Sequence, residues 1–133
     1  MNGLTLDFIG LVTRDLPASL AFYRLLGLDI EEGQDDAPHV ETVLPNGLRL
    51  AWDPISTVHS FDPDYTAPSG GHRVAFAFRA EDPAGVDEAY ARLTGAGHTG
   101  HVAPWDAFWG QRYATVLDPD GNAVDLYAPL PEN

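Results

Sequence analysis

The stretch PWDAFWGQRY gathers side chains that are well suited to binding a small molecule. Trp105, Phe108 and Trp109 lie within five residues of one another, and the acidic Asp106 stands between the first two. Aromatic rings bind flat ligands by stacking, and their quadrupoles attract cations. The same rings could instead cover a sheet edge or form a contact between subunits, because aromatic residues are also enriched in interfaces. The pattern therefore predicts either a stacking site or an interface.

A second candidate is Asp125, the one acidic residue in the segment AVDLYAP. Considered alone, it could be a metal ligand, a carboxylate that binds a ligand, or a solvated side chain. Side chains alternate between the faces of a strand, so we expect Asp125 to point away from Val124 and Leu126. Local chemistry explains the turn DPDGN before it: Pro fixes φ, Gly and Asn tolerate positive φ, and Asp bonds the nearby backbone.

Two helices are predicted to position these residues. Asp15 with a following proline indicates the start of the first helix, and Gly27 is suited to its C-terminal cap. Asp82 marks the start of the second helix in the same way, and Gly95 and Gly97 follow its apolar positions. The strands LTLDFIGLV and RVAFAF precede the two helices. From their spacing we expect a group of aromatic residues to lie in the core: Phe22, Tyr23, Phe76, Phe78 and Tyr90.

The two halves of the chain are related by an internal repeat. One ungapped offset places residues of like type on one another: Ile9 on Phe76, Leu11 on Phe78, Asp15 on Asp82, Tyr23 on Tyr90 and Leu26 on Leu93. Further strands are expected at 28–33, 39–44 and 48–53 in the first half and at 98–103, 111–117 and 123–127 in the second. Asn46-Gly47 predicts a hairpin turn with positive φ angles. The pattern indicates an α+β fold of one domain, residues 1–133, with βαβββ modules at about 1–53 and 72–133 and an irregular linker at 54–71.

Composition narrows the function classes. The chain has 133 residues, no cysteine and a net charge of -13. Such a charge repels phosphate backbones, which argues against nucleic-acid binding, and it favours cationic ligands. No apolar run is long enough to cross a membrane, and no leader is evident. We therefore expect a soluble, cytoplasmic protein.

Three segments carry a resemblance to a known family: VTRDLPASLAFYRLLGLDI, VAFAFRAEDPAGVDEAYARLTGAG and WGQRYATVLDPDGNAVDLYAP. With the spacing of the strands, they resemble the vicinal oxygen chelate superfamily, which includes glyoxalase I, bleomycin-resistance proteins and extradiol dioxygenases. The resemblance implies paired βαβββ modules whose curved mixed sheets form a cup, and often a homodimer. It does not fix the function, because the superfamily contains both metalloenzymes and metal-free binders.

The resemblance also implies where a metal would be held. The position on the first strand is Phe8, which cannot bind a metal, and the position on the first strand of the second module is Arg73, which is itself a cation. Only the position on the last strand, Asp125, keeps a donor. His72 neighbours Arg73, but alternation sends it to the opposite face unless the strand is shifted. We therefore expect no metal; if one does bind, its ligands are His72 and Asp125.

These observations predict a metal-free protein that sequesters a flat or aromatic small molecule, with a preference for cations, and no catalytic residue. Arg73 is expected either to pair with Asp125 or to hold a carboxylate of the ligand, and Arg112 to make a structural pair. One alternative is a divergent glyoxalase- or dioxygenase-type lyase or oxygenase with one divalent metal ion. Another is a structural or regulatory dimer whose own side chains fill the cup. The predicted ligand-binding residues are Phe8, Trp52, Arg73, Trp105, Phe108, Trp109, Arg112, Tyr113 and Asp125.

Overall fold

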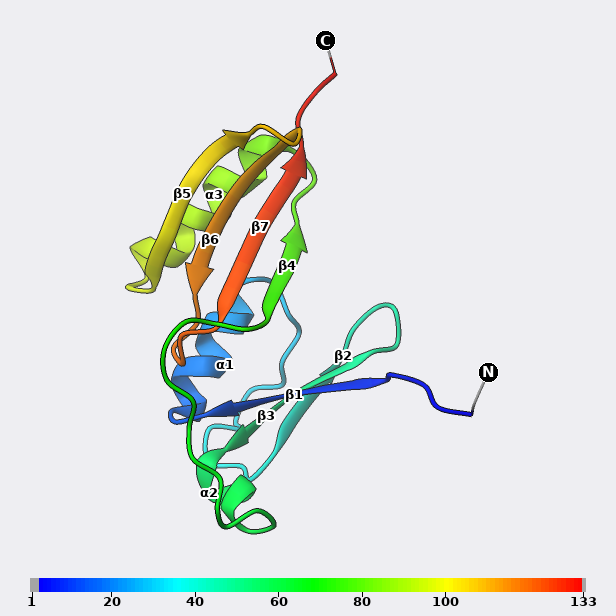
Figure 1. Ribbon diagram of the computed structural model, residues 1–133, viewed down its shortest axis with the longest axis vertical. Helices are drawn as coiled ribbons and strands as arrows, with labels where there is room; N and C mark the ends of the chain where they lie inside the picture. The colour runs from blue at the N-terminus through cyan, green and yellow to red at the C-terminus, as the bar shows by residue number, and fades with distance from the viewer. Residues whose placement is uncertain (1–2, 133) are drawn as a thin grey trace. The chain divides into compact units, whose positions relative to one another are not determined.

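The computed structural model describes residues 3–132 and divides them into two units, the first ending at Pro68 and the second beginning at Ser69. Each unit has one mixed β-sheet and one longer helix (Figure 1). The α+β class and the mixed sheets that the sequence predicts are thereby confirmed. None of the helices in the described part of the chain is long and apolar enough to cross a membrane.

The first unit is built around a central strand. Its elements are β1 (Phe8–Thr13), α1 (Leu16–Leu25), β2 (Val40–Val43), β3 (Arg49–Pro54) and the short helix α2 (Ile55–His59). Strand β3 is parallel to β1 and antiparallel to β2, which gives the order β1-β3-β2. Helix α1 packs against β3. Leu11 and Thr13 are buried at alternate positions of β1, and three consecutive residues of β3 are buried: Leu50, Ala51 and Trp52.

Helix α1 begins and ends where its sequence predicts. The side chain of Asp15 accepts a hydrogen bond from the amide of Ala18 at 3.1 Å, and a proline occupies the first turn. Gly27 has a φ of 96°, a left-handed conformation that only glycine adopts without strain. Asp82 caps α3 (Pro83–Gly95) in the same manner through the amide of Gly85 at 2.9 Å.

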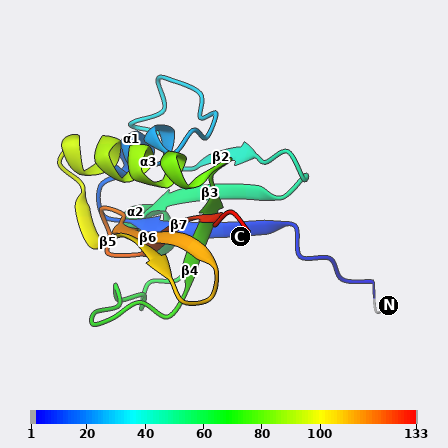
Figure 2. The ribbon, with the colours of Figure 1, turned by 90° about the horizontal axis from the view of Figure 1, so that it is seen from above.

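The second unit is a four-stranded sheet with α3 on one face. Its strands are β4 (Ala75–Arg79), β5 (Thr99–Ala107), β6 (Gln111–Leu117) and β7 (Ala123–Pro129), in the order β4-β7-β6-β5. Only β4 and β7 are parallel. Both views show α3 on one side of this sheet, with no other element of the same unit on the opposite side (Figures 1 and 2). The sheet therefore has one covered and one open face within its unit.

Strand β5 lies at an edge and pairs irregularly with β6. Its ladder shifts register between Gly100 and Val102 and again between Val102 and Trp105. As a result Val102 lies opposite Thr115 and Trp105 lies opposite Tyr113. Each shift inserts residues that lack a partner, which is how a β-bulge re-aims the side chains of a strand.

Residues 28–33 do not form the predicted strand. The guanidinium of Arg24 donates to the carbonyls of Ile30 at 3.2 Å and Glu31 at 2.7 Å, and Thr42 Oγ1 donates to the carbonyl of Asp29 at 2.6 Å. Side chains therefore take acceptors that a strand would offer to a neighbour. The local pattern from which the strand is predicted does not include these side-chain donors.

Other local predictions were also wrong. The linker at 54–71 contains α2, which has a single buried residue, Val58, and is too short to show a period in the sequence. In the hairpin turn only Gly47 has a positive φ, so Asn46 does not need the conformation it tolerates. Among the predicted core aromatics, Phe22 and Tyr23 are fully buried. Three others, on β4 and α3, keep partial exposure: Phe76, Phe78 and Tyr90.

Candidate functional site

The open face of the second sheet brings together several of the predicted site residues. Alternation along β7 buries Val124 and Leu126 on the side of α3 and leaves Asp125 on the other side. The register of β6 and β7 places Thr115 directly opposite Asp125, and Tyr113 opposite Tyr127. The predicted orientation of Asp125 is thereby confirmed.

Asp125 is held by two hydroxyl groups on the neighbouring strand. Tyr113 Oη donates to one carboxylate oxygen at 2.5 Å, and Thr115 Oγ1 donates to the other at 2.8 Å. Each oxygen of an ionised carboxylate has two lone pairs, so each keeps room for one more donor. The carboxylate is thus fixed in orientation and can still accept hydrogen bonds from a ligand.

The chemistry of Tyr113 keeps this arrangement intact at neutral pH. Burial and the hydrogen bond to Asp125 raise the pKa of the phenol from 10 to about 12. Both effects disfavour the phenolate, because that anion would be poorly solvated and would face another anion. Tyr113 therefore remains a donor to Asp125 throughout the physiological range.

A chain of aromatic rings runs beside the carboxylate. Trp105 and Trp109 have ring centroids 5.4 Å apart, Trp109 and Tyr113 5.2 Å, and Tyr113 and Tyr127 6.5 Å. The first two pairs are edge-to-face, a favourable geometry for aromatic pairs. The indole nitrogen of Trp109 donates to Gln111 Oε1 at 2.8 Å, which fixes the orientation of the ring.

These rings remain accessible. Trp105 is 39% exposed and Trp109 47%, while Phe108 at the turn between β5 and β6 is 91% exposed. Phe108 contacts Trp109 edge-to-face, with centroids 4.9 Å apart. The predicted cluster of Trp105, Phe108, Trp109 and Tyr113 therefore forms a partly exposed aromatic surface, and Asp125 lies beside it. We refer to Trp105, Trp109, Tyr113, Asp125 and Tyr127 as the aromatic face.

Arg112 does not belong to this face. It points to the side of α3, where its guanidinium contacts Asp87 at 3.0 Å and Asp106 at 3.1 Å. The hydrogen bond to Asp87 is the main cause that raises the pKa of Arg112. The predicted structural pairing of Arg112 is confirmed, and the structure separates this residue from the other predicted ligand-binding residues.

Arg73 also differs from its prediction. It lies before β4, outside the ladder, and among the described residues it makes no ion pair. The expected pairing with Asp125 is not formed, and the described partners of that carboxylate are Tyr113 and Thr115. A residue two positions outside a strand has no ladder to fix its direction, so alternation could not predict its partner.

In the first unit, the predicted ligand-binding residues Phe8 and Trp52 lie on opposite faces of the sheet. Trp52 is fully buried against α1, with its ring 5.4 Å from that of Tyr23, and its Nε1–H has no hydrogen-bond partner among the described residues. Trp52 is therefore a core residue and not part of an accessible site. Phe8 lies on the other face of the same sheet, where Arg49 Cζ sits 4.9 Å from its ring centroid.

Around Phe8 lies a charged network that the sequence analysis did not identify. His39 Nδ1 lies 2.5 Å from Asp53 Oδ1, His39 Nε2 lies 2.7 Å from Glu41 Oε2, and Arg49 Nη1 donates to Glu41 Oε1 at 3.2 Å. The rings of Phe8 and His39 are stacked, with centroids 6.3 Å apart. His39 and Glu41 are two residues apart within the predicted strand at 39–44, and this spacing was the signal that could have placed them on the same face.

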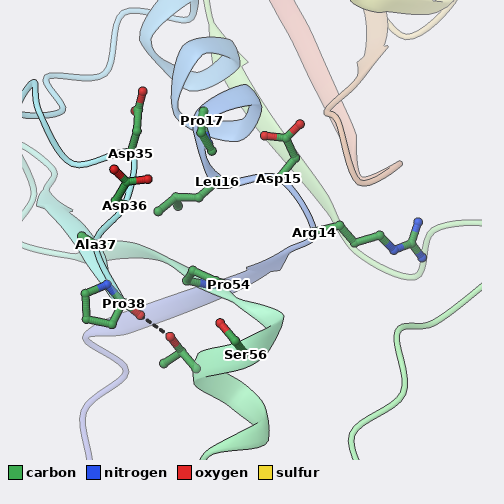
Figure 3. A pocket seen from close by; sticks show the side chains of 11 residues that line it. Arg14, Asp15, Leu16, Pro17, Asp35, Asp36, Ala37, Pro38, Pro54 and Ser56 are labelled. Carbon is green, nitrogen blue, oxygen red and sulfur yellow. Dashed lines mark hydrogen bonds between the residues drawn. The ribbon is translucent and has the colours of Figure 1, made fainter.

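The first unit also contains an open cavity of about 410 Å³ near the start of α1 (Figure 3). One wall is formed by residues 35–38 and the facing wall by Pro54, Ser56 and Thr57. Figure 3 shows Asp35 and Asp36 beside Leu16 and Pro17 on the same side of the cavity. The cavity is distinct from the aromatic face, since all of its lining residues belong to the first unit.

The residues present do not fit the metal that enzymes resembling this chain hold. Phe8 and Arg73 supply no ligand, which leaves Asp125 as the one donor among the three positions that the resemblance implies. His72 lies outside β4 and makes no hydrogen bond or ion pair with any other described residue. The described residues contain no group of three His, Cys, Asp or Glu side chains placed to hold a metal ion.

Several solved structures are similar to this chain over nearly its whole length. A solved structure of a glyoxalase/bleomycin resistance protein/dioxygenase family enzyme from Burkholderia phytofirmans has a TM-score of 0.81 at 20% identity, covering 96% of this chain and 100% of that one. A glyoxalase/bleomycin resistance protein/dioxygenase from Nocardioides gives a TM-score of 0.76 at 26% identity, covering 100% and 88%. An Agrobacterium tumefaciens protein solved by NMR is 31% identical, with a TM-score of 0.71 over 96% and 99%.

A search of the curated proteins finds no significant match. The profile of the Glyoxalase/Bleomycin resistance protein/Dioxygenase superfamily matches residues 5–126, which is nearly all of the chain. The family predicted from the three quoted segments is thereby confirmed, and the solved structures share the fold. The chain belongs to the glyoxalase/bleomycin resistance protein/dioxygenase superfamily.

Proposed function

We propose that this protein binds and sequesters a flat aromatic compound, with a preference for one that carries a positive charge, and that it does so without a metal ion. The observation that carries the proposal is the aromatic face. There an oriented carboxylate, Asp125, lies beside a run of partly exposed rings on a sheet surface that no other element of its unit covers. Rings supply stacking area, and the carboxylate supplies a fixed negative charge.

Three properties favour a cationic ligand over a neutral or anionic one. The five residues of the aromatic face include one carboxylate and no basic side chain, and Arg79 lies opposite Tyr127 on the edge strand β4. The net charge of -13 attracts cations to the protein and repels anions. A cation over an aromatic ring is also stabilised by the ring quadrupole, by about 0.5–2 kcal/mol depending on desolvation.

The test uses two probes of nearly the same shape, N-methylquinolinium and the neutral N-methylquinolone. Binding is measured by tryptophan fluorescence and by the shift in melting temperature, since a ligand that binds the folded state raises it. We expect the cation to bind more tightly than the neutral probe. Failure of both probes to bind, or equal affinity for the two, would contradict the proposed preference.

Variants locate the site. Asp125→Asn keeps the size of the side chain and an acceptor oxygen but removes the charge. We expect it to weaken binding of the cation about tenfold to hundredfold, with little effect on the neutral probe. The probe has no N–H, so what is lost is the Coulomb attraction between its positive charge and the carboxylate, about 1–4 kcal/mol at a separation of about 4 Å. Asp64→Asn is the matched control, because it removes one negative charge, as Asp125→Asn does, but at an exposed position of the first unit. Trp109→Ala is expected to weaken binding of both probes. An unchanged affinity would show that Trp109 is not part of the site.

The competing function is a divergent metal-dependent lyase or oxygenase, which family membership makes the relevant alternative. Elemental analysis of protein purified without chelators distinguishes the two, because one divalent metal ion per chain would contradict the metal-free proposal. We also propose that the protein is a cytoplasmic homodimer, on the basis of the family resemblance and the globular composition. Light scattering tests the dimer against the chain mass of 14.4 kDa.

A further inference from the structure

The ring of His39 is bound on both sides by carboxylates, and this fixes its protonation state. A neutral imidazole carries one N–H, and an ionised carboxylate can only accept a hydrogen bond. Nδ1 lies 2.5 Å from Asp53 Oδ1 and Nε2 lies 2.7 Å from Glu41 Oε2. Two such contacts require a proton on each ring nitrogen. The arrangement is therefore that of a charged imidazolium between two anions.

The two carboxylates lie on different strands. Glu41 belongs to β2 and Asp53 to β3, and the pairing of Val40 with Trp52 places His39 opposite Asp53, just beyond the end of the ladder. Strand β2 is a four-residue strand at the edge of the sheet. The contact of His39 with Asp53 therefore adds one side-chain contact between β2 and β3, one residue beyond their backbone pairing.

This attachment holds one wall of the cavity in the first unit. Residues 35–38, which directly precede His39, form one wall, and residues directly after Asp53 form the facing wall (Figure 3). Thr57 Oγ1 donates to the carbonyl of Pro38 at 2.5 Å and joins the two walls a second time. The contact of His39 with Asp53 thus joins the residue that follows one wall to the residue that precedes the other.

The charged groups around His39 determine which contact is lost first. Those that contact it or its partners are Glu41 on β2, Asp53 and Arg49 on β3, and Asp7 before β1. His59, the titratable residue of α2, contacts the carbonyl of Tyr65 instead. Glu41 has a second partner in Arg49, whereas the side chain of Asp53 has no other partner among the described residues. On loss of one proton, Glu41 can turn fully to Arg49, and the remaining N–H stays on Asp53.

We propose that His39 is a proton-dependent clasp that holds residues 35–38 against the start of α2. Its deprotonation releases Glu41 and replaces the charge-assisted contact with Asp53 by a weaker hydrogen bond from a neutral ring, which loosens this wall of the cavity. The electrostatics agree in direction. The hydrogen bonds to Glu41 and then Asp53 raise the pKa of His39 above 6.5, and burial opposes them. A raised pKa means that the clasp is complete below pH 6.5 and is lost as the pH rises through the folded-state value.

The test follows the imidazole by NMR in the full chain, together with hydrogen-exchange protection factors for residues 35–37. We expect His39 to titrate above pH 6.5, with each unit of elevation equal to a tenfold preference of the folded clasp for the protonated ring. The protection of residues 35–37 should fall over the same range of pH. A titration at or below 6.5, or protection that does not change across it, overturns the proposal.

Variants separate the clasp from other effects of pH. In His39→Gln the protection of residues 35–37 should be low and independent of pH. The control His72→Gln, at an exposed position, should keep the dependence seen in the parent protein. Should His39→Gln fail to fold, Glu41→Gln decides, because it removes one carboxylate and must shift the titration of His39 to lower pH. An unshifted titration in Glu41→Gln contradicts the clasp.

Discussion

Replacing Asp118 with alanine removes the acceptor that organises the turn between β6 and β7. The carboxylate is 5% exposed and accepts from the amides of Asp120 at 2.9 Å and Asn122 at 2.8 Å, and from the side-chain amide of Asn122 at 2.8 Å. A hydrogen bond to a charged group contributes about 1.5–3 kcal/mol. The three share one acceptor, and the freed donors lie in partly exposed residues that water can reach. We therefore expect a total loss of about 2–3 kcal/mol, the value of one to two such bonds.

The loss can be measured by thermal and urea unfolding. A change of 1 kcal/mol shifts the melting temperature of a chain of this size by about 3–5 °C, so Asp118→Ala should lower it by about 6–15 °C. Asp118→Asn keeps an oxygen acceptor for the two backbone amides and should cost roughly half as much. Asp64→Ala is the control, because its exposed side chain makes no hydrogen bond or ion pair with described residues. The reasoning is refuted if Asp118→Ala is as stable as this control.

Other perturbations probe the core, the aromatic face and the edge of the sheet. Trp52→Ala should cost about 3–5 kcal/mol in urea unfolding through loss of core packing, whereas Trp52→Phe should cost less than half of that, because it also removes an unpaired buried N–H. Tyr113 should ionise near pH 12. An alkaline titration followed by absorbance, compared with that of Tyr113→Phe, measures this value. Because its pKa is raised, its contribution to stability is complete below pH 10 and is lost as the pH rises through about 12. Gly100→Ala should lower the free energy of unfolding by about 1–3 kcal/mol, since the added Cβ would lie 2.1 Å from Tyr90 Oη. The double variant with Tyr90→Phe lacks that hydroxyl and should recover part of the loss in urea unfolding. No recovery would show that the hydroxyl is not the obstacle.

Much of the fold could be predicted because short-range rules determine it. The caps at Asp15 and Asp82 and the glycine after the first helix depend only on neighbouring residues. The orientation of Asp125 follows from alternation in a regular strand. The segment at 28–33 could not be predicted in this way, because the competing donors come from Arg24 and from β2, which the local pattern does not include.

The residues of the candidate site could be predicted from their types, but the contacts that each of them makes could not. Trp105, Trp109, Tyr113 and Asp125 were selected for their chemistry, and the structure places them together. Trp52 is predicted to bind the ligand but lies in the core, since an aromatic residue near the end of a strand suits a core as well as a site. The network of His39 was missed because the pairing with Asp53 depends on the register of a hairpin, which one strand alone does not specify.

The two register shifts of β5 have a consequence for the behaviour of the protein in solution. No strand of its own unit pairs with the outer edge of β5, and exposed edges of this kind invite pairing with other molecules and aggregation. The unpaired stretch between Val102 and Trp105 contains Pro104, which has no N–H to offer to an incoming strand. The irregularity that aims Trp105 at the open face therefore also makes this edge a poor template for fibril growth. The chain can display exposed tryptophan rings beside an edge that resists the addition of further strands.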